Sequence, residues 1–128
     1  MIIAVDFDGT CVTHEFPNVG KEIPKAEYVL RSLIECEHSI ILYTMRSNIN
    51  GYNYLDDAVN WFKDRDLKLF AVNSNPEQSD WTTSPKVYAQ LYIDDAALGT
   101  PLIYGKHHRP YVDWKEVHKL LQERGLIG

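Results

Sequence analysis

The stretch IIAVDFDGT, residues 2–10, decides how the rest of the chain is interpreted. An apolar run typical of a strand delivers two aspartates, Asp6 and Asp8, and then Gly9. Alternate side chains of an extended segment point the same way, so the two carboxylates are expected close together at the end of the strand. Such a pair repels itself and usually needs a cation, a shared proton or basic neighbours. A divalent metal at the carboxyl end of a buried strand is the simplest explanation.

A second acidic pair, Asp94-Asp95, ends another apolar run, Leu91-Tyr92-Ile93. We expect this pair to supply the remaining oxygen ligands of the same metal.

Length and composition favour a single domain over residues 1–128, because 128 residues that are 45% hydrophobic can form one core. The net charge of −5 argues against general nucleic-acid binding, which needs a basic surface. No apolar run approaches the roughly 18 residues that span a membrane, and the chain starts directly on a strand pattern. We therefore expect a cytoplasmic protein whose cysteines, Cys11 and Cys36, are reduced.

Short apolar runs alternate with helical patterns, which is typical of a parallel sheet covered by helices. The expected strands are Ile2–Val5, Ser39–Tyr43, Leu67–Val72, Gln90–Ile93 and Pro101–Tyr104. The expected helices are Lys25–Glu37, Asp56–Arg65 and Asp113–Arg124, and the segments between them are expected to be irregular. Ligands of an open parallel sheet bind at the carboxyl ends of its strands. Five polar residues fall there: Asp6, Asp8, Thr44, Asp94 and Asp95.

The order of these residues resembles the haloacid dehalogenase superfamily. The resemblance consists of Asp6-x-Asp8-Gly-Thr after the first strand, Thr44 after the second, Lys86 before the fourth and Asp94-Asp95 after it. It covers roughly the first three-quarters of the chain. It implies an α/β fold of three layers (α/β/α, Rossmann-like) with a parallel sheet of about five strands. Receiver domains of two-component signalling use similar residues in a different order, which this chain does not fit.

The resemblance implies a phosphatase that acts on phosphate monoesters. Asp6 would be the nucleophile that forms an aspartyl-phosphate, and Asp8 the general acid and then base. Thr44 and the main-chain N–H of Met45 would bind the phosphate, and Lys86 would neutralise it. The family's dehalogenases lack the second acid, so Asp8 favours phosphate-ester cleavage.

The resemblance also implies a Mg²⁺ cofactor. Its ligands would be Asp6, the main-chain carbonyl of Asp8, Asp94 and, through water or by orienting Lys86, Asp95. Magnesium accepts one or two carboxylates together with substrate oxygens and water, so this set suffices.

Neither Cys11–His38 nor Ser74–Pro85 has room for a cap domain, so the resemblance implies a capless member with an open site. In the family such sites often serve large substrates or are covered by a neighbouring subunit. For this chain, the second case would be a homo-oligomer in which one copy covers the site of another. The expected substrate is a phosphorylated small molecule or a nucleotide. His14 and Arg46 are candidate substrate contacts, and the basic run Lys106–Arg109 is a weaker one.

Two alternatives stay open at this point. The chain could be a catalytically weak domain of the same type that binds or regulates. It could also be a phosphotransferase, because transfer to an acceptor other than water shares the covalent intermediate.

Overall fold

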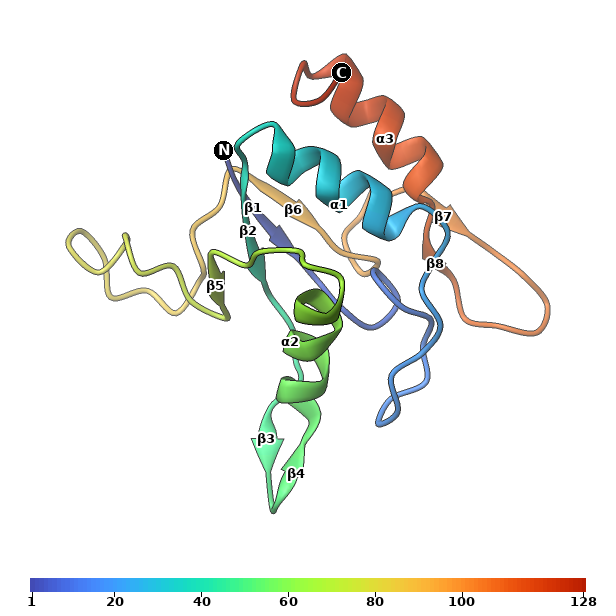
Figure 1. The fold of residues 1–128 in the computed structure, drawn as a ribbon, viewed down its shortest axis with the longest axis horizontal. Helices are drawn as coiled ribbons and strands as arrows, with labels where there is room; N and C mark the ends of the chain where they lie inside the picture. Colours follow the sequence, from blue (N-terminus) through green and yellow to red (C-terminus); the bar gives the residue numbers. More distant parts are fainter.

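Four short strands form the central sheet (Figure 1): β1 (Ile2–Val5), β2 (Ser39–Leu42), β5 (Ala71–Val72) and β6 (Leu91–Ile93). The computed structural model describes all residues, 1–128. The strand order is β5-β2-β1-β6, and each neighbouring pair is parallel. Val5 of the central strand is level with Leu42 and with Ile93. Because the three strands end level, the residues that follow them emerge at one edge of the sheet.

Three helices accompany the sheet: α1 (Ala26–Glu35), α2 (Tyr54–Asp64) and α3 (Trp114–Glu123). Each was expected from the sequence, with ends that agree to within two residues. The first turn of α3 is capped by the Asp113 carboxylate, which accepts a hydrogen bond of 3.3 Å from the Glu116 N–H. Gly125, with φ of 72°, follows the same helix and ends it.

The main hydrophobic core lies on one face of the sheet. Ile3 and Val5 of β1 and Leu42 of β2 belong to it, together with the buried residues of all three helices. Trp114 of α3 and Phe62 of α2 are among its largest fully buried side chains. All three helices thus pack on the same face.

The opposite face carries Ala4 and Ile41, which are buried but lie outside this core. The segment 73–90, which has no helix, covers it: Val87 is buried, and the Tyr92 hydroxyl donates to the Val87 carbonyl at 2.6 Å. The steps β1 to β2 and β2 to β5 run in one direction, so right-handed crossovers put α1 and α2 on one face. The step from β5 to β6 reverses direction and takes its crossover to the other face.

The expectation of an α/β fold with a parallel sheet is therefore confirmed, whereas that of helices on both faces is not. The second helical layer is missing because the segment 73–90 is polar and interrupted by Pro76 and Pro85.

A strand forms within the expected range Pro101–Tyr104, but the expectation that it would join the central sheet was wrong. β7 (Leu102–Ile103) pairs antiparallel with β8 (Tyr111–Val112) and not with the central sheet. A further antiparallel pair, β3 (Asn48–Ile49) and β4 (Tyr52–Asn53), lies in a segment expected to be irregular. Of the expected strand Leu67–Val72, only the last two residues form β5.

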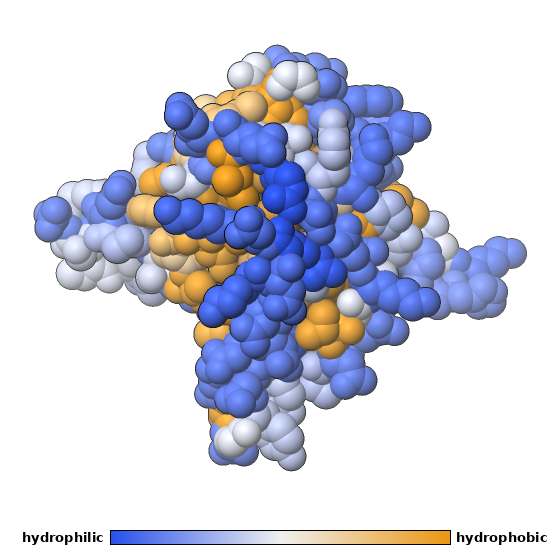
Figure 2. Space-filling model, in the orientation of Figure 1, coloured by the Kyte–Doolittle hydropathy of each residue, from blue (hydrophilic) through white to orange (hydrophobic).

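None of the three helices is both long enough and apolar enough to cross a bilayer. The face seen in Figure 2 is largely hydrophilic, with separate hydrophobic areas between the polar side chains. Both cysteines are free, Cys11 buried and Cys36 exposed.

Candidate functional site

Three carboxylates meet at the carboxyl edge of the sheet. Asp6 follows β1, and Asp94 and Asp95 follow β6; one oxygen from each lies within 4.8 Å of the other two. The backbone fixes this arrangement, since the Asp6 N–H donates to the Ile93 carbonyl at 3.0 Å and so continues the β1–β6 ladder beyond the strand. The structure therefore brings together three of the aspartates that the sequence singled out.

This cluster is electrostatically unfavourable as it stands. Burial raises the pKa of Asp6 to about 8, and the negative charge of Asp94 adds to the effect. Burial also raises the pKa of Asp94, with a contribution from Asp95. Neither Asp6 nor Asp94 forms an ion pair with a lysine or arginine. Crowded, partly buried carboxylate oxygens, of which those of Asp6 and Asp94 have no ion-pair partner, fit a divalent cation such as Mg²⁺.

Thr10 fixes the positions of two members of the cluster. Its hydroxyl donates to Asp6 Oδ2 at 2.9 Å and accepts from the Asp95 N–H at 3.1 Å. Thr10 is itself fully buried, and its carbonyl accepts a 2.6 Å hydrogen bond from the Trp114 indole. The last helix thereby anchors the loop that carries Asp6. Thr10, although part of the Asp6-x-Asp8-Gly-Thr motif, was not among the site residues expected from the sequence, and neither was Trp114.

His14 contacts Asp95 directly. Its Nε2 lies 2.8 Å from Asp95 Oδ2, and both side chains are largely buried. Gly9 makes room for this pair: its φ is 84°, and a Cβ at this position would collide with His14 Nε2 and Asp95 Oδ2. His14, a candidate substrate contact from the sequence, thus orients an aspartate of the cluster.

The carboxylate of Asp8 does not join the acidic cluster. It forms a two-bond ion pair with Arg46, from Nε to Oδ2 at 2.7 Å and from Nη2 to Oδ1 at 2.8 Å. The Arg46 side chain is 1% exposed. A bidentate pair of this kind fixes the direction in which the carboxylate points.

All five N–H donors of Arg46 are used within the protein. Besides Asp8, the guanidinium donates to the carbonyls of Pro17, Asn18 and Tyr54, at 3.3, 2.9 and 3.2 Å. Arg46 therefore ties the loop after β1 to the start of α2. The sequence offered it as a substrate contact, but the structure leaves it no donor for one.

Thr44 and Met45 follow β2 at the same edge. The Tyr43 N–H donates to the Val5 carbonyl at 2.8 Å, which places Tyr43 level with Asp6. The Thr44 N–H donates to Asn73 Oδ1 at 2.8 Å, and its hydroxyl accepts from the Arg46 N–H at 3.1 Å. Met45 is 96% exposed.

Lys86 is exposed and forms no ion pair with an aspartate of the cluster. Its ammonium lies 5.7 Å from the centre of the Tyr92 ring. Tyr92 lies within β6, and Asp94 follows the strand two residues further along the chain. Because side chains alternate along an extended segment, the two lie on the same face. Lys86 thus approaches the sheet from the side to which Asp94 belongs, without reaching the carboxylates.

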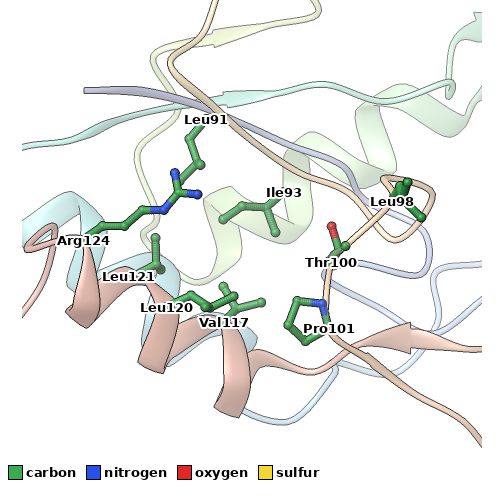
Figure 3. Close-up of a pocket in the computed structure, with 10 residues that line it drawn as sticks. Leu91, Ile93, Leu98, Thr100, Pro101, Val117, Leu120, Leu121 and Arg124 are labelled. Atoms are coloured by element: carbon green, nitrogen blue, oxygen red, sulfur yellow. The ribbon is translucent and has the colours of Figure 1, made fainter.

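Two other features lie away from the aspartates. The basic run Lys106–Arg109 forms the exposed loop between β7 and β8. An apolar groove of about 330 Å³ runs between β6, the loop at Thr100 and α3, with Arg124 over one end (Figure 3). None of its lining residues belongs to the acidic cluster.

The fold and the site define an α/β domain with a parallel sheet and an acidic cluster at the carboxyl edge of that sheet. No protein-family model matches the chain, and no curated protein matches it. A solved structure, described as that of a conserved protein coded by a locus from Bacteroides thetaiotaomicron, is 36% identical in sequence with a TM-score of 0.76. The match covers 97% of this chain and 91% of that one. The chain belongs to the same family as this conserved Bacteroides protein.

Proposed function

We propose that this protein is a Mg²⁺-dependent phosphomonoester hydrolase of the haloacid dehalogenase type, with Asp6 as its nucleophile. The observation that carries the proposal is the meeting of Asp6, Asp94 and Asp95 within 4.8 Å at the sheet edge where Asp8 and Thr44 also emerge. The strand order β5-β2-β1-β6 supports it, because it puts the two acid-bearing strands side by side.

In this mechanism an oxygen of Asp6 attacks the phosphorus atom, and the bond to the leaving-group oxygen breaks. Asp8 gives a proton to that oxygen. Water then attacks the phosphorus of the aspartyl-phosphate, Asp8 takes a proton from that water, and the bond between phosphorus and the Asp6 oxygen breaks, so that phosphate leaves and Asp6 is restored. A bound Mg²⁺ would be held by Asp6, Asp94 and Asp95 and would supply charge neutralisation for the phosphoryl group.

The other residues position these groups. Arg46 holds the Asp8 carboxyl in one direction through both proton transfers. Thr10 holds Asp6, and His14 holds Asp95. Thr44, the Met45 N–H and Lys86 are assigned to the phosphate oxygens. Placement and charge matter most here because phosphoryl transfer has a loose transition state.

The test is hydrolysis of an aryl phosphate by purified protein with Mg²⁺ and with a chelator. We expect turnover that the chelator removes, that Asp6→Asn abolishes and that Asp8→Asn lowers by about 10²–10⁴-fold. Asp57→Asn, an exposed aspartate of α2, is the matched control and keeps full activity.

Folded protein that turns over no phosphate ester in a broad panel would contradict the proposal. That result would instead support a domain that binds or regulates. Formation of a new ester in the presence of an alcohol acceptor would identify a phosphotransferase.

A further inference from the structure

Three aromatic rings form a continuous row that starts at Arg46. The guanidinium carbon of Arg46 lies 5.2 Å from the centre of the Phe7 ring and 5.1 Å from the centre of the Phe16 ring. Phe16 in turn contacts Tyr54, with ring centres 5.2 Å apart. Tyr54 stacks on Tyr52 at 5.3 Å, with the ring planes 3° from parallel. Two segments distant in sequence thus build one aromatic surface.

This row faces outward from the protein. Phe16 is 57% exposed and Tyr52 is 59% exposed, so the row adds little to the core. Both the loop after β1 and the β3–β4 hairpin project from the sheet edge that carries the aspartates (Figure 1).

The row begins near Asp8, the residue proposed to protonate the leaving-group oxygen. Arg46, on which Phe16 lies, is joined to Asp8 by two hydrogen bonds. If Asp8 protonates the leaving-group oxygen, the rest of the leaving group lies near Asp8 and therefore near this row. Since all the Arg46 donors are satisfied, the row offers ring faces to that group and no free guanidinium.

We infer that the row Phe16–Tyr54–Tyr52 binds a planar ring of the leaving group, so that the substrate is a nucleotide-like phosphomonoester and not a simple sugar phosphate. This inference rests on the proposed function. Exposed aromatic side chains bind nucleobases by stacking, and the interaction tolerates different bases because every base has a π-face. The flat, parallel Tyr52–Tyr54 pair has the form such a contact requires.

A matched pair of substrates isolates the ring. Adenosine 5′-monophosphate and ribose 5-phosphate carry the same primary phosphate and sugar, and differ by the base. We expect kcat/KM of the wild type to be about tenfold or more higher for the nucleotide. Uridine 5′-monophosphate is expected to share part of this advantage, because stacking does not depend on one base.

Variants of Tyr52 test whether the row is responsible. Tyr52→Ala should lower the ratio of the two kcat/KM values several-fold, whereas Tyr52→Phe, which keeps the ring, should retain it. Tyr28→Ala is the control, because Tyr28 is 59% exposed but lies on α1, where its ring contacts His118 of α3. It should leave the ratio and the activity unchanged.

The outcomes separate this inference from the proposed function. Equal kcat/KM values for the two substrates would overturn the inference and leave the hydrolase intact. Absence of hydrolysis of both substrates and of the aryl phosphate would remove the proposed function and the inference with it. A dimer that Tyr52→Ala converts to a monomer, with the substrate ratio unchanged, would show that a second copy covers the row and would also overturn the inference.

Discussion

Arg46 and Asp8 form a two-bond ion pair, 2.7 and 2.8 Å long, in which the arginine is fully enclosed and the aspartate is 18% exposed. The two residues lie 38 positions apart, so the pair holds the loop after β1 against the segment after β2. Removal of one partner of a buried pair leaves the other charge without compensation.

Arg46→Met should therefore destabilise the protein by about 3–5 kcal/mol. Chemical denaturation measures the change in the free energy of unfolding. Lys119→Met is the matched control: Lys119 pairs with Glu116 on an exposed helix face and should cost about 0.5 kcal/mol or less. In a double-mutant cycle, Arg46→Met with Asp8→Asn should cost less than the sum of the single changes. Additive costs would show that the pair contributes nothing as a unit.

Gly9→Ala should damage both stability and cation binding. The new Cβ would have to occupy the space of the His14–Asp95 pair. The backbone would also be strained, because an alanine rarely adopts a φ of 84°. Gly99→Ala separates the two effects, because Gly99 has a φ of 97° and open space around it. We expect that control to cost about 1–2 kcal/mol and to bind Mg²⁺ normally. Normal Mg²⁺ affinity of Gly9→Ala by calorimetry would contradict the crowding argument.

The raised pKa of Asp6 predicts a pH-dependent stability in the absence of a cation. With a pKa near 8 in the folded chain and 3.8 as its ordinary value, Asp6 keeps a proton that the unfolded chain releases. The stability contribution is complete below about pH 4 and is lost as the pH rises toward about 8. Thermal unfolding with chelator should show a fall in Tm across this window that is smaller in Asp6→Asn, where only the raised pKa of Asp94 still contributes.

Mg²⁺ should reverse this fall, because it replaces the proton as the partner of the Asp6 carboxylate. We expect a larger rise in Tm with Mg²⁺ at pH 8 than at pH 5 in the wild type. Equal rises at the two pH values would argue against a cation at Asp6.

Lys86→Met should separate activity from stability. Lys86 is exposed and its ammonium lies near the Tyr92 ring, so the free energy of unfolding should change by about 1 kcal/mol or less. Loss of the charge assigned to the phosphoryl group should lower kcat for the aryl phosphate by about a hundredfold or more. Unchanged kcat would remove Lys86 from the proposed site.

The regular elements and the shared sheet edge could be predicted from the sequence because they depend on local patterns. The run Ile2–Val5 and the helical spacing in α1 and α3 specify their own conformations, and parallel strands bring Asp6 and Asp94 to one edge. The β3–β4 hairpin also has a local signal that was overlooked. Asn50-Gly51, flanked by Ile49 and Tyr52, is typical of a tight hairpin turn, and both residues have positive φ.

The contacts that shape the site could not be predicted, because they join distant parts of the chain. The His14–Asp95 pair spans 81 positions, and nothing near either residue specifies the other. The charge of Arg46 suggested an anionic ligand, but the choice of Asp8 depends on how the folded chain encloses it. The expected helix over the second sheet face failed for a different reason: family likeness suggested it, and the local sequence 73–90 did not support it.

The hydrogen bond from the Trp114 indole to the Thr10 carbonyl has a consequence for biosynthesis. Ribosomes release the amino end of a chain first, so the strand that bears Asp6 emerges well before α3 does. Until Trp114 arrives, the buried Thr10 carbonyl lacks its donor, and the hydroxyl of the same residue is what connects Asp6 to Asp95. The hydrogen bonds around the acidic centre are therefore complete only once α3 is in place, and a nascent polypeptide halted before α3 would carry Asp6 without that support.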